Sequence, residues 1–214
     1  MTQRIVVIDY GMGNLHSVVK ALEYVGGDAV TVELTDCAEH ILNADRVVFP
    51  GQGAARDCMR AMRDHGLIDV IKESARTKPF LGICMGLQAL MSWSEENDGT
   101  ECLGVYSGKV LRFRNQPGGA RLKIPHMGWN SIRQVRAHPL FAGIDDGAFF
   151  YFVHSYYVAP DDVTLTVGVT DYGIEFTSVI AHDNVFAMQC HPEKSAQAGL
   201  TLLKNFVQWD GGSR

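Results

Sequence analysis

The stretch Phe80-Leu81-Gly82-Ile83-Cys84-Met85-Gly86 decides the fold, because an apolar run passes through a glycine-flanked cysteine into a helical segment. A nucleophilic residue between two glycines, where a strand turns sharply into a helix, is typical of a nucleophile elbow. The glycines keep side chains away from a turn that strains the central residue. These residues fit two interpretations equally: a reactive thiol at a helix N-terminus, or a buried cysteine in a turn that needs glycines for packing.

Strand-like and helix-like segments alternate through the first half of the chain. Apolar runs suited to buried parallel strands occur at residues 5–8, 29–32, 46–49 and 80–83. Helical spacing of apolar residues covers residues 15–25, 54–64 and 67–76, and a further helix begins at about residue 85. The alternation predicts an α/β fold with a mostly parallel central sheet and helices on both faces.

The second half has short strand-like runs separated by turn signals. They lie at residues 109–113, 131–135, 149–153, 165–169, 178–181 and 185–188. Asp183-Asn184 is a candidate hairpin tip, and a last helix is expected over residues 195–209. We therefore expect an antiparallel extension of the sheet from the second half. Without repeats or linkers, the chain is expected to form a single domain over residues 1–210, followed by a tail at 211–214.

Length, composition and charge exclude several classes of protein. The chain has 214 residues, of which 46% are hydrophobic, and its net charge is −5. No cluster of lysine and arginine indicates nucleic-acid binding. The apolar runs are far shorter than the ~20 residues of a membrane helix. A strand-like segment already starts at residue 5, which leaves no room for a signal peptide, so we expect a cytoplasmic protein that does not contact a membrane.

The five cysteines, at positions 37, 58, 84, 102 and 190, show neither regular spacing nor a CxxC pair. The spacing of the cysteines and histidines therefore suggests no metal site, and we expect no metal or organic cofactor. Most of these cysteines are interpreted as small apolar residues in a reducing compartment. Cys190 is expected to point into the core, away from its neighbour His191, since adjacent strand side chains alternate.

A base for Cys84 is available in His191-Pro192-Glu193, 107 residues further along the chain. Proline biases the preceding residue toward extended backbone, and side chains two apart on an extended segment share a face. Glu193 would then orient the His191 imidazole, which is the arrangement of nucleophile, base and orienting group. Taken alone, the tripeptide also fits a surface turn.

A glycine-rich loop, Pro50-Gly51-Gln52-Gly53, follows a predicted strand. It would lie beside the elbow, at the carboxyl edge of the sheet, where open α/β sheets bind ligands. A backbone N–H of this loop is a candidate second oxyanion donor, although the loop also fits an ordinary strand–helix turn. Gly11-Met12-Gly13 does not start a dinucleotide-binding fingerprint, because the position of the third glycine is His16.

The elbow cysteine, the Pro-Gly-x-Gly loop and the late His-Pro-Glu together resemble the triad glutamine amidotransferases. More narrowly, three segments resemble the glutaminase subunits of imidazole glycerol phosphate synthases, which act in histidine biosynthesis. These are Asp9-Tyr10-Gly11-Met12-Gly13-Asn14-Leu15, Pro125-His126-Met127-Gly128-Trp129-Asn130 and His191-Pro192-Glu193-Lys194-Ser195. The resemblance extends from residue 5 to about residue 206.

The resemblance implies a role for each matching residue. Cys84 would attack the side-chain amide of glutamine to give a γ-glutamyl thioester and ammonia, and water would then release glutamate. His191 would act as base and then acid, oriented by Glu193. The backbone N–H groups of Met85 and of Gly51 or Gln52 would form the oxyanion hole. The implied substrate-binding residues are Gln88, Glu96, His154, Ser155 and Tyr156.

A partner is also implied, because the chain is too short to hold an ammonia-accepting domain as well. The resemblance indicates a heterodimer with a (β/α)₈-barrel cyclase, which makes imidazole glycerol phosphate and an aminoimidazole carboxamide ribonucleotide. Asn14, Trp129 and Lys194 match positions that face this partner. One departure concerns Gln52, which stands where relatives usually carry a small apolar residue.

Three other functions remain open from the sequence. The chain could be the glutaminase subunit of another synthase, such as one for anthranilate, pyridoxal phosphate or guanylate. It could be a stand-alone cysteine hydrolase of peptides or γ-glutamyl compounds, using the same elbow. It could also be a non-catalytic interaction module, which an intact set of Cys84, His191 and Glu193 argues against.

Overall fold

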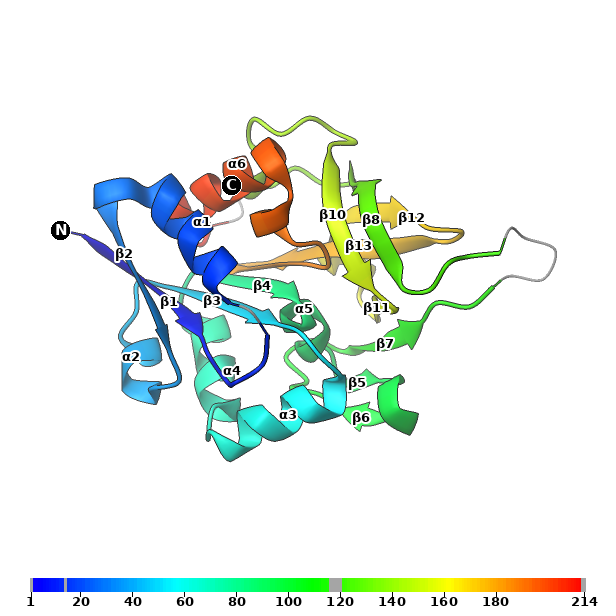
Figure 1. Ribbon diagram of the computed structural model, residues 1–214, viewed down its shortest axis with the longest axis horizontal. Coiled ribbons are helices and arrows are strands. Elements are labelled where there is room, and N and C mark those ends of the chain that lie inside the picture. Colours follow the sequence, from blue (N-terminus) through cyan, green and yellow to red (C-terminus); the bar gives the residue numbers. More distant parts are fainter. Residues whose placement is uncertain (1, 14, 116–120, 213–214) are drawn as a thin grey trace.

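The computed structural model describes residues 2–13, 15–115 and 121–212 and has a twisted central sheet (Figure 1). One half of this sheet is parallel, as the alternation of strands and helices predicts. Its strands are, in spatial order, β2 (Val30–Thr35), β1 (Gln3–Ile8), β3 (Arg46–Gly51), β4 (Phe80–Cys84) and β14 (Val185–Met188).

The other half of the sheet is mostly antiparallel and, apart from the two-residue strands β5 and β6, is built from the second half of the chain. It continues from β14 through β13 (Glu175–His182), β11 (Tyr156–Pro160), β7 (Gly108–Arg112), β5 (Trp93–Ser94) and β6 (Thr100–Glu101). Two further strands, β12 (Thr166–Asp171) and β9 (Arg133–Gln134), extend it beside β13. A separate antiparallel pair is formed by β8 (His126–Ser131) and β10 (Phe149–His154).

Helices cover both faces of the parallel half (Figure 1). One face carries α1 (His16–Gly26) and α6 (Ala196–Gln208), and the other carries α2 (Ala38–Leu42), α3 (Ala55–Asp64), α4 (Ile68–Thr77) and α5 (Met85–Ala89). Short 3₁₀ helices lie at Gly27–Ala29, Glu96–Asp98, Pro139–Phe141, Val163–Leu165 and Pro192–Lys194. No helix within the described ranges is both long and apolar enough to span a bilayer.

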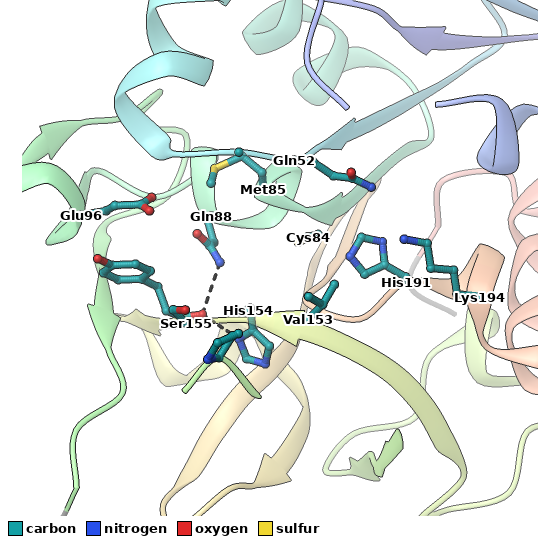
Figure 2. Close-up of a pocket in the computed structure, with 13 residues that line it drawn as sticks. Gln52, Cys84, Met85, Gln88, Glu96, Val153, His154, Ser155, His191 and Lys194 are labelled. Atoms are coloured by element: carbon teal, nitrogen blue, oxygen red, sulfur yellow. Dashed lines mark hydrogen bonds between the residues drawn. The ribbon is translucent and has the colours of Figure 1, made fainter. Parts of the chain in front are cut away.

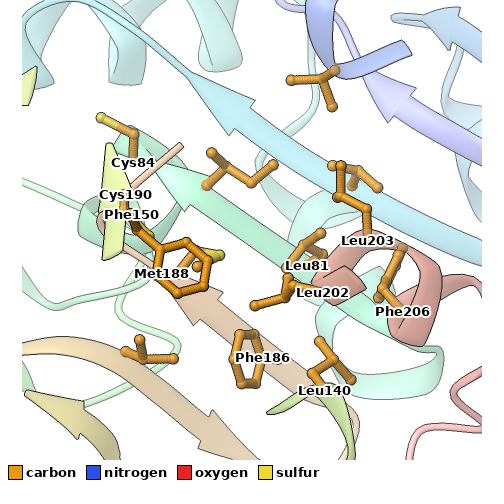
Figure 3. Close-up of a cluster of buried hydrophobic side chains, with 14 of the residues drawn as sticks. Leu81, Cys84, Leu140, Phe150, Phe186, Met188, Cys190, Leu202, Leu203 and Phe206 are labelled. Carbon is orange, nitrogen blue, oxygen red and sulfur yellow. The ribbon is translucent and has the colours of Figure 1, made fainter. Parts of the chain in front are cut away.

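Two hydrophobic cores lie on the two faces of the sheet, because side chains alternate along each strand. In β1, Ile5 and Val7 enter the core under α1 and α6, whereas Val6 and Ile8 enter the core under α3 and α4. Figure 3 shows the first core, in which Leu202, Leu203 and Phe206 of α6 pack with Leu81 of β4 and with Phe186 and Met188 of β14.

The predicted fold class is confirmed, and the differences concern short or polar elements. A single strand was expected over residues 131–135, but the chain leaves β8 at Ser131 and forms the short β9 after the buried Ile132. The glycine, histidine and asparagine of residues 126–130 give no clear β pattern, so sequence spacing misplaced this strand. Strand β11 and helix α2 were not predicted, and both are only five residues long.

The elbow joins β4 to α5 at a sharp angle. Cys84 has φ 55° and ψ −107°, a left-handed conformation that a non-glycine residue adopts only when its surroundings enforce it. Gly86 brings α5 directly onto β3, because a Cβ atom there would lie 1.8 Å from the carbonyl oxygen of Phe49. The sequence Gly-x-Cys-x-Gly therefore fixes the angle between strand and helix.

The substitution Gly86→Ala tests this packing. Its added methyl group has to push α5 away from the Phe49 carbonyl, so we expect a loss of unfolding free energy of at least about 1–3 kcal/mol. Equilibrium denaturation measures the change. Gly212→Ala is the control, since its Cβ would meet only the Asp210 side chain, and it should leave the transition unchanged. Equal stability of Gly86→Ala and the parent chain would contradict the close approach.

Candidate active site

The parallel strands β3, β4 and β14 end at the same edge of the sheet, and this edge positions the site. Gly51 at the end of β3 is paired with Cys84 at the end of β4. Met188, the last residue of β14, is paired with Ile83, so that the chain continues past Cys84 toward His191. The carboxyl edge of the sheet therefore brings together segments that lie more than a hundred residues apart in the sequence.

A cavity of about 440 Å³ opens at this edge (Figure 2). Ten of the residues singled out in the sequence line it: Gln52, Cys84, Met85, Gln88, Glu96, His154, Ser155, Tyr156, His191 and Lys194. Gly51 and Glu193 lie behind its wall, around a much smaller void that also contacts His191. The cavity wall also includes Gly53 and Pro125, which belong to segments quoted in the sequence analysis, and Val153, which was expected only as part of a strand.

The His191 ring links Cys84 to Glu193. Its Nδ1 lies 2.9 Å from Oε1 of Glu193, and both side chains are 2% exposed. Among the described residues, Nε2 makes no hydrogen bond, and Cys84 lies close enough to influence the charge of the ring. Burial lowers the pKa of His191, but the contacts with Cys84 and Glu193 raise it to about 10. The structure therefore favours an imidazolium beside the sulfur at neutral pH.

The backbone around His191 differs from the extended segment that was expected. His191 itself is extended, with φ −104° and ψ 97°, but Pro192–Lys194 form a 3₁₀ turn that brings Glu193 back to the ring. The His191 N–H donates to the carbonyl of Tyr151 on β10 at 2.9 Å. Its carbonyl accepts from the Ser195 hydroxyl at 2.5 Å, which itself accepts from the Tyr151 N–H at 2.9 Å. The ring is thus fixed through its backbone to β10.

The proposed oxyanion donors lie on two sides of Cys84. Met85 begins α5, and the side chain of Cys84, at the N-cap position, makes no capping hydrogen bond. Gly51 is packed against the buried Tyr10 hydroxyl, which a Cβ atom at Gly51 would approach to 2.0 Å. The Gln52 carbonyl accepts a hydrogen bond from the Cys58 thiol at 3.4 Å. The loop is therefore held by contacts from behind, away from the cavity.

The far wall of the cavity contains the residues matched to substrate binding. The Gln88 Nε2 donates to the Tyr156 carbonyl at 3.3 Å, and the same carbonyl contacts His154 Nδ1 at 2.7 Å. Glu96 accepts a hydrogen bond from the Ala55 N–H at 2.7 Å, so its carboxylate caps α3 while facing the cavity. The wall thus offers a carboxylate, amide groups and backbone groups to a small polar ligand.

The three residues matched to a partner interface do not all fall at the cavity. Lys194 lines it, whereas Trp129 is 52% exposed on the outer face of the β8–β10 pair. Met127 and Phe149 are 59% and 61% exposed, and the register places them on the same face as Trp129. Asn14 lies outside the described residues.

Gln189 is the site residue that the sequence reasoning missed. Its side chain is fully buried, and its Nε2 donates to the Cys84 Sγ at 3.6 Å. It lies two positions before His191, so the alternation used to place Glu193 beside His191 would also have pointed to it.

The cysteines other than Cys84 take no part in the cavity wall. All five are free thiols, and Cys190 is fully buried in the core beneath α6, as alternation predicts (Figure 3). Burial raises the pKa of the Cys190 thiol well above its usual range. Within residues 2–13, 15–115 and 121–212, no group of three or more histidine, cysteine, aspartate or glutamate side chains is arranged to hold a metal ion.

Solved structures share this fold at low sequence identity. One described as a glutamine amidotransferase is 16% identical, covers 95% of this chain and 97% of its own, and gives a TM-score of 0.70. The PurLQS structure from Thermotoga maritima is 19% identical, covers 97% of this chain and 99% of its own, and gives a TM-score of 0.69. At such identities the likeness concerns the fold alone.

Sequence relatives are much closer. The imidazole glycerol phosphate synthase subunit HisH of Chromobacterium violaceum is 53% identical over 210 residues, which cover 97% of this chain and 99% of that protein. The HisH subunit of Thiobacillus denitrificans is 54% identical over 216 residues, covering 99% and 94%. The family model for glutamine amidotransferase class-I matches residues 6–209. The chain therefore belongs to the class-I glutamine amidotransferases and, within them, to the HisH subunits of imidazole glycerol phosphate synthase.

Proposed function

We propose that this chain hydrolyses glutamine to glutamate and ammonia at Cys84 and passes the ammonia to a cyclase subunit in histidine biosynthesis. That cyclase makes imidazole glycerol phosphate and an aminoimidazole carboxamide ribonucleotide. The observation that carries the proposal is the strained Cys84 beside a buried His191–Glu193 pair, at the wall of a cavity. Membership of the HisH subunits supports the pathway.

In the first half of the reaction, the Cys84 thiolate attacks the side-chain amide carbon of glutamine. A tetrahedral intermediate forms, and its negative oxygen is stabilised by backbone N–H groups of Met85 and of Gly51 or Gln52. The His191 imidazolium gives its Nε2 proton to the leaving nitrogen. Ammonia departs, and a γ-glutamyl thioester remains on Cys84.

In the second half, the now neutral His191 takes a proton from water as the water oxygen attacks the thioester carbon. Collapse of the second tetrahedral intermediate releases glutamate and restores the thiolate and the imidazolium. Glu193 holds Nδ1 of the ring at 2.9 Å, which keeps Nε2 directed at the reacting atoms in both steps.

Substrate recognition is assigned to the far wall of the cavity. We place the glutamine between Gln88, Glu96 and the segment His154–Tyr156, with the Glu96 carboxylate facing the substrate ammonium group. This arrangement positions the substrate amide toward Cys84.

The cyclase is proposed to be a (β/α)₈ barrel that docks on the outer face of β8–β10. Three large apolar side chains, Met127, Trp129 and Phe149, are exposed together there, which is typical of an interaction surface. Tyr151 is paired with Trp129 in register, and its backbone holds His191. Free ammonia becomes ammonium in neutral water and loses its nucleophilicity, so direct transfer between docked subunits preserves it. A cytoplasmic location fits this role.

A stand-alone cysteine hydrolase is the second candidate, and the docking face argues against it. A hydrolase of peptides or γ-glutamyl compounds has no need of an exposed apolar face on the β8–β10 pair. A glutaminase subunit of another synthase would use the same triad, but the relatives over 50% identical named above are HisH subunits.

The substitution Cys84→Ala should abolish glutamate release from glutamine, by at least about a thousandfold, because no other group can form the thioester. Release is measured with the cyclase subunit and its ribonucleotide ligand present. Fold and binding to the cyclase should be unchanged. Cys102→Ala, which removes a thiol outside the cavity wall, should retain full activity. Turnover that persists in Cys84→Ala would rule out the mechanism.

The same variant should shift the titration of His191. With the sulfur gone, burial lowers the pKa of the ring and only Glu193 still raises it, so we expect a fall of at least about one unit from about 10. The imidazolium is then lost at a lower pH. NMR titration of the histidine side chains, assigned with His191→Gln, measures it. A value that stays at about 10 would show that Cys84 does not stabilise the imidazolium.

The docking face is tested by Trp129→Ala. Removal of this side chain should raise the dissociation constant for the cyclase by about tenfold or more, as for buried aromatic anchors. Calorimetric titration measures it, and glutamine hydrolysis by the isolated chain serves to check the active site. Tyr24→Ala, an exposed aromatic residue on α1, is the control and should bind normally. Unchanged affinity of Trp129→Ala would place the partner elsewhere.

A further inference from the structure

Gln189 has a fully buried side chain that the proposed mechanism does not use. A primary amide in such a place is costly unless its donors and acceptor are hydrogen-bonded. Gln189 directly follows β14, whose last residue, Met188, is paired with Ile83. Its backbone N–H donates to the Ser178 carbonyl at 2.8 Å. The backbone thus holds the side chain next to Cys84.

The direction of the Gln189 amide is determined by its neighbours. The Tyr156 carbonyl can only accept, so it faces the Nε2 of Gln88, at 3.3 Å. The same Nε2 donates to Oε1 of Gln189 at 3.0 Å. Gln189 therefore presents its own Nε2 to the sulfur of Cys84, at 3.6 Å. An N–H donor, and not a carbonyl oxygen, faces the nucleophile.

Two histidine side chains, linked by hydrogen bonds, hold the Tyr156 carbonyl in place. His154 Nδ1 lies 2.7 Å from the Tyr156 carbonyl, and His154 Nε2 lies 2.9 Å from His126 Nδ1. Asn130 Nδ2 approaches His126 Nε2 at 3.3 Å and also donates to the Asp171 carbonyl at 2.8 Å.

Both rings of this chain are neutral near pH 7. Burial lowers the pKa of His126 to about 4 and that of His154 to about 3. Each ring therefore carries one proton, and the Tyr156 carbonyl requires it on Nδ1 of His154. His126 then donates from its Nδ1 and accepts at its Nε2. From Asn130 through His126 to His154, the bonds between these side chains point toward the Tyr156 carbonyl. This carbonyl is therefore held as an acceptor for the Gln88 Nε2, which favours a single orientation of the Gln88 amide.

We propose that Gln189 is a positioning residue for the nucleophile, whose N–H donates to the Cys84 sulfur and favours the thiolate directed at the substrate. The proposal rests on the proposed function in taking Cys84 as the nucleophile. Gln88 acts on the sulfur only through Gln189, by holding its amide in the donating orientation.

The test measures alkylation of Cys84 by iodoacetamide in the full chain, in which the thiolate displaces iodide from the reagent. Gln189→Met keeps the volume but removes the donor. At neutral pH we expect it to slow the reaction about tenfold, as for loss of a hydrogen bond to a charged group. At high pH, where the thiol is ionised in both proteins, the two rates should converge. Peptide mass spectrometry separates Cys84 from the exposed Cys37.

Two further variants separate a donor to sulfur from a general packing role. Gln88→Met should raise the KM for glutamine but slow alkylation less than Gln189→Met, because Gln189 keeps its donor. Greater slowing by Gln88→Met than by Gln189→Met would show that Gln189 is not the group that acts on the sulfur, and would overturn the proposal. Gln197→Met, which removes an exposed amide bonded to Thr201, is the control and should react at the parent rate.

The outcomes also distinguish this proposal from the proposed function. Gln189→Leu is a second variant that removes the same donor. If folded Gln189→Met or Gln189→Leu is alkylated at the parent rate at neutral pH, the positioning role is overturned and the glutaminase mechanism remains intact. Turnover by Cys84→Ala would overturn the mechanism itself. Slowed alkylation that persists at high pH would indicate blocked access in place of thiolate stabilisation, and would also overturn the proposal.

Discussion

The close contact between α5 and the Phe49 carbonyl is the constraint on which the rest of the site depends. It leaves no room for a side chain at Gly86, and it holds the chain in the bend that forces Cys84 to a positive φ. The strain is maintained by packing on both sides of the elbow, because β4 lies between β3 and β14 in the centre of the sheet. A loosely packed turn would relax to ordinary backbone angles and turn the sulfur away from the strand ends.

The charge of the His191 ring depends on where the elbow places the Cys84 sulfur. The sulfur reaches a ring that is almost completely buried, where an isolated imidazolium would be unfavourable. The charged ring is stable because Glu193 lies on one side of it and Cys84 on the other. Water has little access to the His191–Glu193 contact, so this interaction is stronger than the same contact on the protein surface. Backbone bonds to β10 keep the ring in place without using its nitrogens.

The sequence was sufficient to predict the fold class, the longer strands and helices and the residues at the carboxyl edge of the sheet, because apolar periodicity and glycine positions report local geometry. It could not predict contacts that depend on register between distant segments. Gln189 is one such case, since its partners Gln88 and Cys84 lie about a hundred residues away. The 3₁₀ turn at Pro192–Lys194 is another, because proline fits both an extended segment and the first position of a helix. Strand β8 was misplaced because its buried side carries His126 and its exposed side carries Met127 and Trp129, which reverses the usual placement of apolar residues.

The imidazole chain through Asn130, His126 and His154 has an evolutionary consequence. Its bonds all run in one direction, so replacing any one member leaves a nitrogen of one of the two buried histidine rings without its partner. Single substitutions are therefore costly, while joint replacement by apolar residues of matching shape is much less so. We expect these three positions to change together over the divergence of such chains, as one inherited unit and not as three independent sites.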